Sequence, residues 1–172
     1  MGQHMSLDKS TIKNLELTET LFEKKLKGSL LGVLDKTHTA MGSRKMKQWL
    51  KEPLNDGDMI RQRLDAVEVL LDEILIRNNI KEHLKRVYDF ERLTGRIACG
   101  NANGKDLIAL RNSCAVLPDI KAELDGTGAY LLDELNSQIH PLSDVYDLID
   151  KSIVEDPPFV IKEGGLIKQG FS

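Results

Sequence analysis

Apolar residues recur at helical spacing along most of the chain. The clearest pattern begins at Asp58, where isoleucine, leucine and valine repeat every three or four positions and define one helix face. Polar residues such as Arg61 and Glu68 cover the opposite side. We predict one amphipathic helix along this stripe, ended at Asn78-Asn79, and a second helix that begins near Ile80. The stripe consists of Ile60, Leu64, Val67, Leu71, Ile74 and Leu75.

Another helix is predicted between Thr39 and Pro53. The Thr39 hydroxyl can accept a hydrogen bond from a free N–H of the first turn. Pro53 lacks an N–H and disfavours helical geometry at Glu52, so the helix should stop there. Trp49, the only tryptophan, shares an apolar face with Met46. Because a buried tryptophan needs close neighbours, we expect other helices to pack around Trp49.

The remaining patterns predict a mainly α protein: a multi-helical array in which short loops connect antiparallel helices. Two extended elements complete it: a short segment near the N-terminus, where residues 11–18 alternate loosely, and a small C-terminal β-hairpin. The hairpin pairs residues 159–161 with Leu166-Ile167 around a turn at residues 163–165. Further helices are expected over residues 29–35, 80–87, 89–97, 107–117, 120–124, 131–139 and 145–153.

Composition narrows the class of protein. The chain has 172 residues, which suits one domain or two small helical lobes, and 41% apolar with 30% charged residues is typical of a soluble globular protein. Its net charge of -3 argues against autonomous binding to DNA phosphates, since such domains are usually basic. No apolar run could cross a bilayer, and the two cysteines indicate a reducing, cytoplasmic location. Residues 1–5 resemble an expression-vector remnant, and no signal peptide is visible.

The segment Gly100–Asp106, GNANGKD, has some features of a phosphate-binding loop. That loop needs GxxxxGK followed by serine or threonine, after a strand, so that backbone N–H groups surround the phosphates. Here the glycines are one residue too close, Asp106 replaces the hydroxyl residue, and a predicted helix precedes the loop. We interpret the segment as a connection between helices.

The other candidate groups also favour structural roles. No histidine has the spacing to another histidine or cysteine that suits zinc, and Cys114 lies in an apolar stripe. Cys99, at a helix end, is a weak candidate for a reactive thiol. The paired acids Asp72-Glu73 and Asp133-Glu134 are expected on solvated helix faces. We therefore predict no catalytic, cofactor-binding, DNA-binding or metal site. The histidines are His4, His38, His83 and His140.

Two lysine-rich faces could contact phosphates. They lack interleaved aromatic residues on which bases could stack, and the chain is acidic overall. Solvated faces are therefore the favoured interpretation. The faces comprise Lys24, Lys25 and Lys27, and Arg44, Lys45, Lys47 and Lys51.

Short motifs in a fixed order carry a more specific signal. They are Asn14–Thr18 (NLELT), Ser29–Leu31 with Leu34-Asp35, Thr39–Arg44 (TAMGSR) with Trp49-Leu50 and Pro53-Leu54, Arg63–Glu68 (RLDAVE), Asp89–Ala98 (DxERLxxRIA), Asp106-Leu107, Leu117-Pro118, Pro157-Pro158, and Gly164–Ile167 with Gly170. This series resembles the core of the MutS family of DNA mismatch-recognition ATPases, from about Asp8 to Ser172.

The resemblance implies that residues 6–172 form the N-terminal part of the helical core or lever domain, without the mismatch-binding, connector, clamp and ATPase domains. It implies a lever that couples the ATPase end to the DNA-binding end of the parent protein and has no catalysis of its own. ATP and magnesium would serve the full-length protein, whose partners would be mismatched duplex DNA, a second subunit and the other parent domains, with no membrane. No catalytic or base-reading residue of the family maps onto this chain. A stand-alone helical adaptor and a weak, non-specific DNA-binding module stay open as alternatives.

Overall fold

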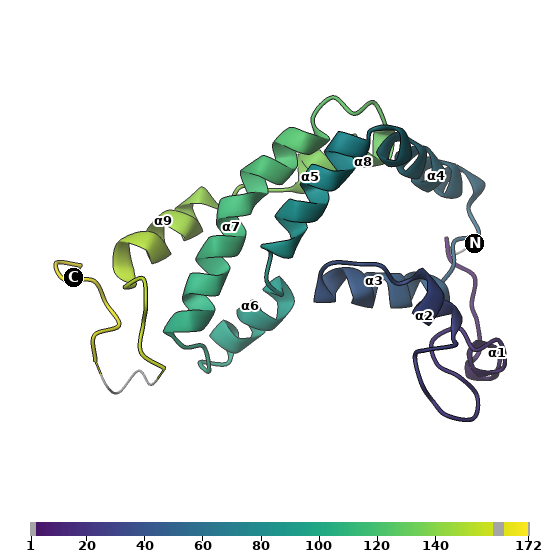
Figure 1. Ribbon diagram of the computed structural model, residues 1–172, viewed down its shortest axis with the longest axis horizontal. Coiled ribbons are helices and arrows are strands. Elements are labelled where there is room, and N and C mark those ends of the chain that lie inside the picture. The colour runs from purple at the N-terminus through teal and green to yellow at the C-terminus, as the bar shows by residue number, and fades with distance from the viewer. Residues whose placement is uncertain (1–2, 160–163, 172) are drawn as a thin grey trace. The chain divides into compact units, whose positions relative to one another are not determined.

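The computed structural model describes residues 3–159 and 164–171, and these residues form helices joined by loops, without a sheet (Figure 1). The prediction of a mainly α, multi-helical protein is confirmed. The chain divides into two compact units, Met1–Glu68 and Val69–Ser172. None of the described helices combines the length and hydrophobicity that a membrane span requires.

The helices of the first unit begin at side-chain caps. They are α1 (Lys9–Asn14), α2 (Leu30–Leu34), α3 (Ala40–Lys51) and most of α4 (Gly57–Asp72). The Thr39 hydroxyl accepts from the N–H of Gly42 at 2.9 Å, which confirms the predicted start of α3. Ser29 caps α2 in the same way, through the N–H of Gly32 at 3.1 Å. These caps satisfy N–H groups that have no partner inside the helix.

The extended segment predicted over residues 11–18 is wrong. Asp8 accepts from the N–H of Thr11 at 2.7 Å and starts α1 there, and Glu16 then turns the chain with a φ of 49°. Leu17 is buried, and its carbonyl accepts from the N–H of Leu31 at 2.9 Å. The loose alternation of apolar residues fits a short capped helix as well as a strand, and the cap decides between them.

Trp49 does not lie in a core as predicted. None of the described α3 residues is buried, and Trp49 is 36% exposed. The guanidinium of Arg63, from α4, lies 3.7 Å from the centroid of the Trp49 ring. Burial lowers the pKa of Arg63 from its ordinary value. The ring is therefore covered by a cation–π contact rather than by several helices.

The break after α4 falls at Glu73, not at Asn78-Asn79, so α5 runs from Ile74 to Lys85. The guanidinium of Arg77 donates to the carbonyls of Leu70 and Leu71, at 3.2 and 3.4 Å. These bonds satisfy carbonyls at the end of α4 that have no helical partner. An arginine one turn beyond the break thus stabilises it.

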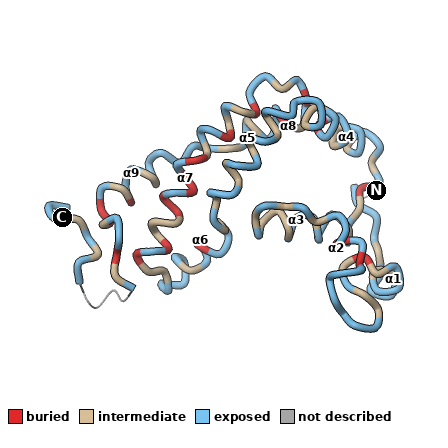
Figure 2. Tube along the Cα trace, in the orientation of Figure 1, coloured by how far each residue is buried: buried red, intermediate tan, exposed pale blue. Residues whose placement is uncertain are grey.

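One long helix organises the second unit. α7 (Gly104–Leu124) contacts α5, α6 (Phe90–Ala98), α8 (Tyr130–Gln138) and α9 (Ser143–Ser152). Buried positions recur along α7 in Figure 2. The core around it contains Leu93, Leu110, Cys114, Ile149 and Ile153.

The predicted helix end near Pro118 is wrong, because α7 continues through this residue to Leu124. Proline lacks an N–H, so the carbonyl of Cys114 loses its helical partner. Ile120 and Leu124, beyond the proline, are both buried. We attribute the continuation of the helix to the packing of these turns on both sides of Pro118.

The predicted C-terminal hairpin is not supported. Residues 160–163 lie outside the described part of the chain, and Ile167 forms its antiparallel bridge with Ile153. The carbonyl of Leu166 accepts from the N–H of Val154 at 3.0 Å, and the N–H of Lys168 donates to the carbonyl of Ser152 at 2.7 Å. Residues 164–168, which we call the return segment, therefore pair with the end of α9, where a helix leaves backbone groups without partners.

Candidate functional site

The phosphate-loop-like segment forms the start of α7. The side chain of Asn103 accepts from the N–H of Asp106 at 3.0 Å, and Asp106 accepts from the N–H of Asn103 at 2.9 Å. The Asp106 carboxylate also accepts from Nε of Arg96 at 2.9 Å. Two of the N–H groups that could hold a phosphate are thus occupied, and a carboxylate stands beside them. These residues do not fit a nucleotide.

Burial alone would raise the pKa of Asp106. The hydrogen bonds from the Asn103 N–H and from Arg96 outweigh this effect and hold the pKa of Asp106 below its ordinary value. Asp106 is therefore an ionised capping residue that joins the end of α6 to the start of α7.

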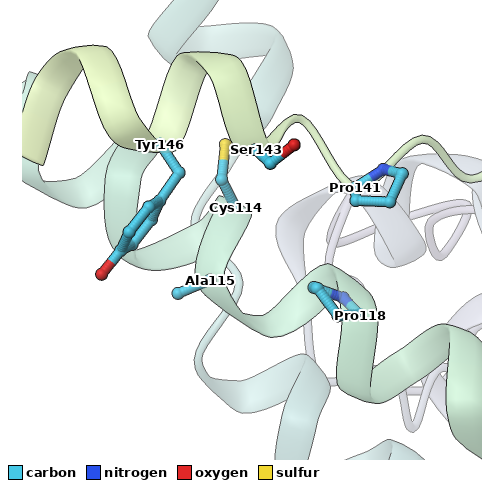
Figure 3. Close-up of a pocket in the computed structure, with 6 residues that line it drawn as sticks. All are labelled: Cys114, Ala115, Pro118, Pro141, Ser143 and Tyr146. Atoms are coloured by element: carbon cyan, nitrogen blue, oxygen red, sulfur yellow. The ribbon is translucent and has the colours of Figure 1, made fainter.

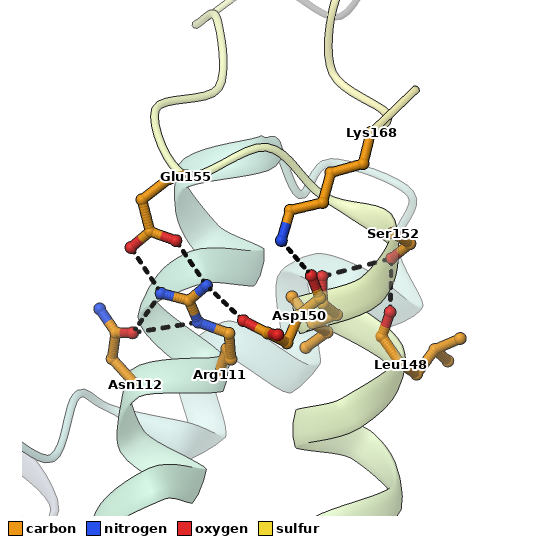
Figure 4. Close-up of polar contacts among 8 residues, drawn as sticks. Arg111, Asn112, Leu148, Asp150, Ser152, Glu155 and Lys168 are labelled. Carbon is orange, nitrogen blue, oxygen red and sulfur yellow. Dashed lines mark hydrogen bonds and ion pairs between the residues drawn. The ribbon is translucent and has the colours of Figure 1, made fainter. Parts of the chain in front are cut away.

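A polar cluster on α7 was not predicted from the sequence. The buried guanidinium of Arg111 donates two hydrogen bonds of 2.7 Å to the carboxylate of Glu155 and one of 3.0 Å to Asp150 (Figure 4). We call Arg111, Asp150 and Glu155 the arginine clamp. A bidentate pair of this kind fixes orientation as well as distance. The clamp joins α7 to α9 and to the segment that follows it.

Ionisation in the arginine clamp follows from these contacts. The hydrogen bonds with Glu155 raise the pKa of Arg111 and lower the pKa of Glu155 from their ordinary values. Lys168 of the return segment donates to the backbone carbonyl of Asp150 (Figure 4). The only signal for the clamp in the sequence is an arginine directly after Leu110 in an apolar stripe, which says nothing about its distant partners.

A cavity of about 260 Å³ lies where α7 contains its proline. Cys114, Ala115 and Pro118 of α7 line it together with Pro141, Ser143 and Tyr146 (Figure 3). Burial, and secondarily the charge of Asp144, raise the pKa of the Cys114 thiol, so the nucleophilic thiolate is disfavoured. Cys114 packs in the core, as predicted.

The structure does not bring the other candidate residues together. Among the residues 3–159 and 164–171, no three histidine, cysteine, aspartate or glutamate side chains are placed to hold a metal ion. Nδ1 of His83 lies 4.0 Å from a carboxylate oxygen of Asp119, whereas His4, His38 and His140 are exposed. Cys99 is exposed at the end of α6. The paired acids Asp72-Glu73 and Asp133-Glu134 lie exposed on or beside their helices.

The predicted stripe on α4 is exposed. Leu64, Val67 and Leu71 retain 61, 53 and 58% of their accessible surface, and Ala66 is the buried residue of this helix. We call Ile60, Leu64, Val67 and Leu71 the α4 stripe. Contiguous apolar surface of this kind marks an interface more often than a solvated helix.

Comparison with known proteins agrees with the order of the motifs. Residues 10–169 match the profile of MutS domain III. The chain is 49% identical over 170 residues to the DNA mismatch repair protein MutS of Alkaliphilus oremlandii, and 50% identical over 173 residues to that of Ruminiclostridium cellulolyticum. These matches cover 99 and 100% of the chain but 19 and 20% of the relatives, so the chain spans about a fifth of their length.

Proposed function

The chain belongs to the MutS family through its domain III, and from this premise we propose that residues 6–172 are the first part of a lever domain in a longer MutS-type protein. In this role the helices couple an ATP-hydrolysing end to a DNA-binding end in the cytoplasm. The curated relatives carry the name DNA mismatch repair protein MutS, which supports mismatched duplex DNA, a second subunit and the other domains of the same protein as partners.

The packing around α7 supports this role. A lever transmits a displacement only if its helices move together, through contiguous packing and polar contacts. α7 contacts four other helices, and the arginine clamp adds charge-assisted bonds from α7 to α9 and to Glu155. The second unit therefore has the contacts that a stiff element needs.

The observation that carries the proposal is the exposed α4 stripe. Full burial of a leucine or valine side chain contributes about 1.5–3 kcal/mol, so three half-exposed side chains leave considerable stabilisation unused. We propose that another segment of the longer protein covers the stripe and receives motion through it.

The same proposal assigns ATP and magnesium to parts of the protein outside this chain. Residues Gly100–Asp106 do not fit a nucleotide, because their N–H groups and carboxylate serve as a helix cap. No step of ATP hydrolysis is therefore assigned to these residues. The purified chain should release no phosphate from ATP, and turnover that survives repeated purification would contradict this assignment.

Coupling can be tested in the longer MutS-type protein that contains this chain. We expect Leu64→Gln combined with Leu71→Gln to leave the basal rate of ATP hydrolysis unchanged and to reduce its response to mismatched DNA at least threefold. The reason is that polar side chains weaken the interface through which the stripe acts, without touching the ATP site.

The matched control is Asp65→Asn combined with Glu68→Gln, which changes exposed polar positions of the same helix. This variant should keep the response to mismatched DNA. If the leucine variant responds like the unmodified protein, the α4 stripe has no part in coupling. A stand-alone helical adaptor is the alternative, and it would be favoured if the natural reading frame that encodes this chain contained no ATPase sequence.

A further inference from the structure

Four lysines from two helices of the first unit line one cleft. Lys9 and Lys13 come from α1, and Lys47 and Lys51 come from α3. The cleft has a volume of about 380 Å³, and Ile12, Thr18 and Glu19 complete its lining. Glu19 is thus the single acid among these lining residues. The sequence suggested solvated faces for Lys47 and Lys51, whereas the fold places them with two lysines from far earlier in the chain.

None of the four lysines has an anionic partner among the residues that the structure describes. Within the residues that it describes, none of them forms an ion pair or a side-chain hydrogen bond. Lys25 of the same unit, by contrast, pairs with Glu23 at 2.9 Å. The cleft keeps its positive charge in a protein whose net charge is -3.

The acids beside these lysines in the sequence are engaged elsewhere. Asp8 accepts from the N–H and the hydroxyl of Thr11, at 2.7 and 3.2 Å. Glu16 accepts from the N–H of Leu21 at 2.6 Å, and Glu52 accepts from the amide of Gln48 at 3.0 Å. These carboxylates therefore form local hydrogen bonds and do not pair with the lysines of the cleft.

The arrangement of the lysines suits a row of phosphates. Each helix contributes its pair at positions i and i+4, which lie on one face about 6 Å apart along the axis. Successive phosphates of a DNA strand advance by about 3.4 Å along the duplex. A pair of amines at this spacing spans about two phosphates. Like charges at this spacing destabilise a helix, so an anion that binds both amines is favoured.

The lining also distinguishes a duplex from a single strand. Proteins that hold single strands usually place aromatic rings under the bases, and none of the described lining residues is aromatic. We propose that the cleft lined by Lys9, Lys13, Lys47 and Lys51 binds the phosphodiester backbone of duplex nucleic acid, without sequence preference. This contact is separate from the α4 stripe and does not depend on the lever role.

The test measures binding of the whole chain to a labelled 20-base-pair duplex by fluorescence anisotropy, between 50 and 200 mM salt. Four neutralised phosphates give a slope of log affinity against log salt of about -3.6, or a loss of about 150-fold over this range. Replacing all four cleft lysines by glutamine should abolish most of this slope and weaken binding at least tenfold at 50 mM salt.

The control removes four exposed lysines elsewhere, so that both variants have the same net charge. It should bind within threefold of the unmodified chain, and equal losses in the two variants would overturn the proposal. Circular dichroism should show unchanged helix content in both variants, because these lysine side chains contribute little to the hydrophobic core. The control substitutions are Lys24→Gln, Lys27→Gln, Lys36→Gln and Lys81→Gln.

Competitors identify the anion that the cleft takes. Polyglutamate, inorganic phosphate and a free nucleoside triphosphate should displace the duplex no better than sodium chloride of equal ionic strength. Stronger displacement by the triphosphate or by phosphate would point to a small-ligand site, and stronger displacement by polyglutamate would point to an acidic peptide. Either result would overturn the assignment to a nucleic-acid backbone.

Discussion

Adding one methyl group at Gly104 should destabilise the second unit. A Cβ at this position would lie 2.4 Å from Cβ of Pro157 and 2.5 Å from Cδ1 of Leu166. Carbon atoms pack best at about 3.5–4.0 Å, so both contacts are about 1 Å too short. Gly104 is held in the first turn of α7, so the new methyl group can be accommodated only if Pro157 or Leu166 moves away. Overpacking of this kind typically costs about 1–3 kcal/mol, and we expect that loss for Gly104→Ala.

A matched substitution should change the free energy of unfolding in the opposite direction. Gly95 lies inside α6, and a Cβ there would meet no atom within 4 Å. Alanine restricts the unfolded chain more than glycine and suits a helix interior, so Gly95→Ala should stabilise the protein by about 0.4–1 kcal/mol. The two variants carry the same chemical change in neighbouring helices, and only the space around the new methyl group differs.

The free energy of unfolding is measured in urea by near-ultraviolet circular dichroism of tyrosine. All three tyrosines, Tyr88, Tyr130 and Tyr146, lie in the second unit, so their signal reports the unfolding of that unit. Trp49 lies in the first unit. Hydrogen exchange adds a local measurement. Gly104→Ala should reduce protection of the amides of Val154 and Lys168, which bond to Leu166 and Ser152. If Gly104→Ala is as stable as Gly95→Ala, the close packing of the return segment on α7 is refuted.

Three further expectations follow from burial and ionisation. In urea unfolding, Trp49→Ala should lower the free energy of unfolding by about 1–2 kcal/mol. Val116 is fully buried, so Val116→Ala should lower it by about 2–3 kcal/mol. A larger loss for Trp49→Ala than for Val116→Ala would place Trp49 in a core. The ionised form of Asp106 stabilises the fold above the pKa of an unfolded aspartate, and this stabilisation is lost as pH falls through the lowered folded pKa. Asp106→Asn should therefore be less stable than the parent at pH 7, and urea unfolding at a series of pH values should show the difference vanishing in acid. Iodoacetamide should label exposed Cys99 in the native chain and spare buried Cys114, as peptide mass spectrometry can check; equal labelling would contradict the packing of Cys114.

The sequence alone determined the features that depend on neighbours along the chain. A hydroxyl at Thr39 or Ser29 caps a helix through an N–H three residues later, so both starts could be predicted. The ordered motifs indicated the family, which the match to MutS domain III confirmed. The predicted extended segment is wrong for a local reason too, because apolar residues at 12, 15 and 17 fit both a helix and a strand, and the Asp8 side chain caps the helix.

Only the tertiary structure decided which groups meet across long separations. Arg111 finds Asp150 and Glu155, 39 and 44 residues away, and Ile167 pairs with Ile153 rather than within a hairpin. Helical periodicity predicts which face is apolar but not whether another element covers it, so the exposure of Trp49 could not be read from its stripe. The convergence of lysines from α1 and α3 on one cleft has the same origin. Burial and charge clusters arise from distant contacts, whereas periodicity and capping are local.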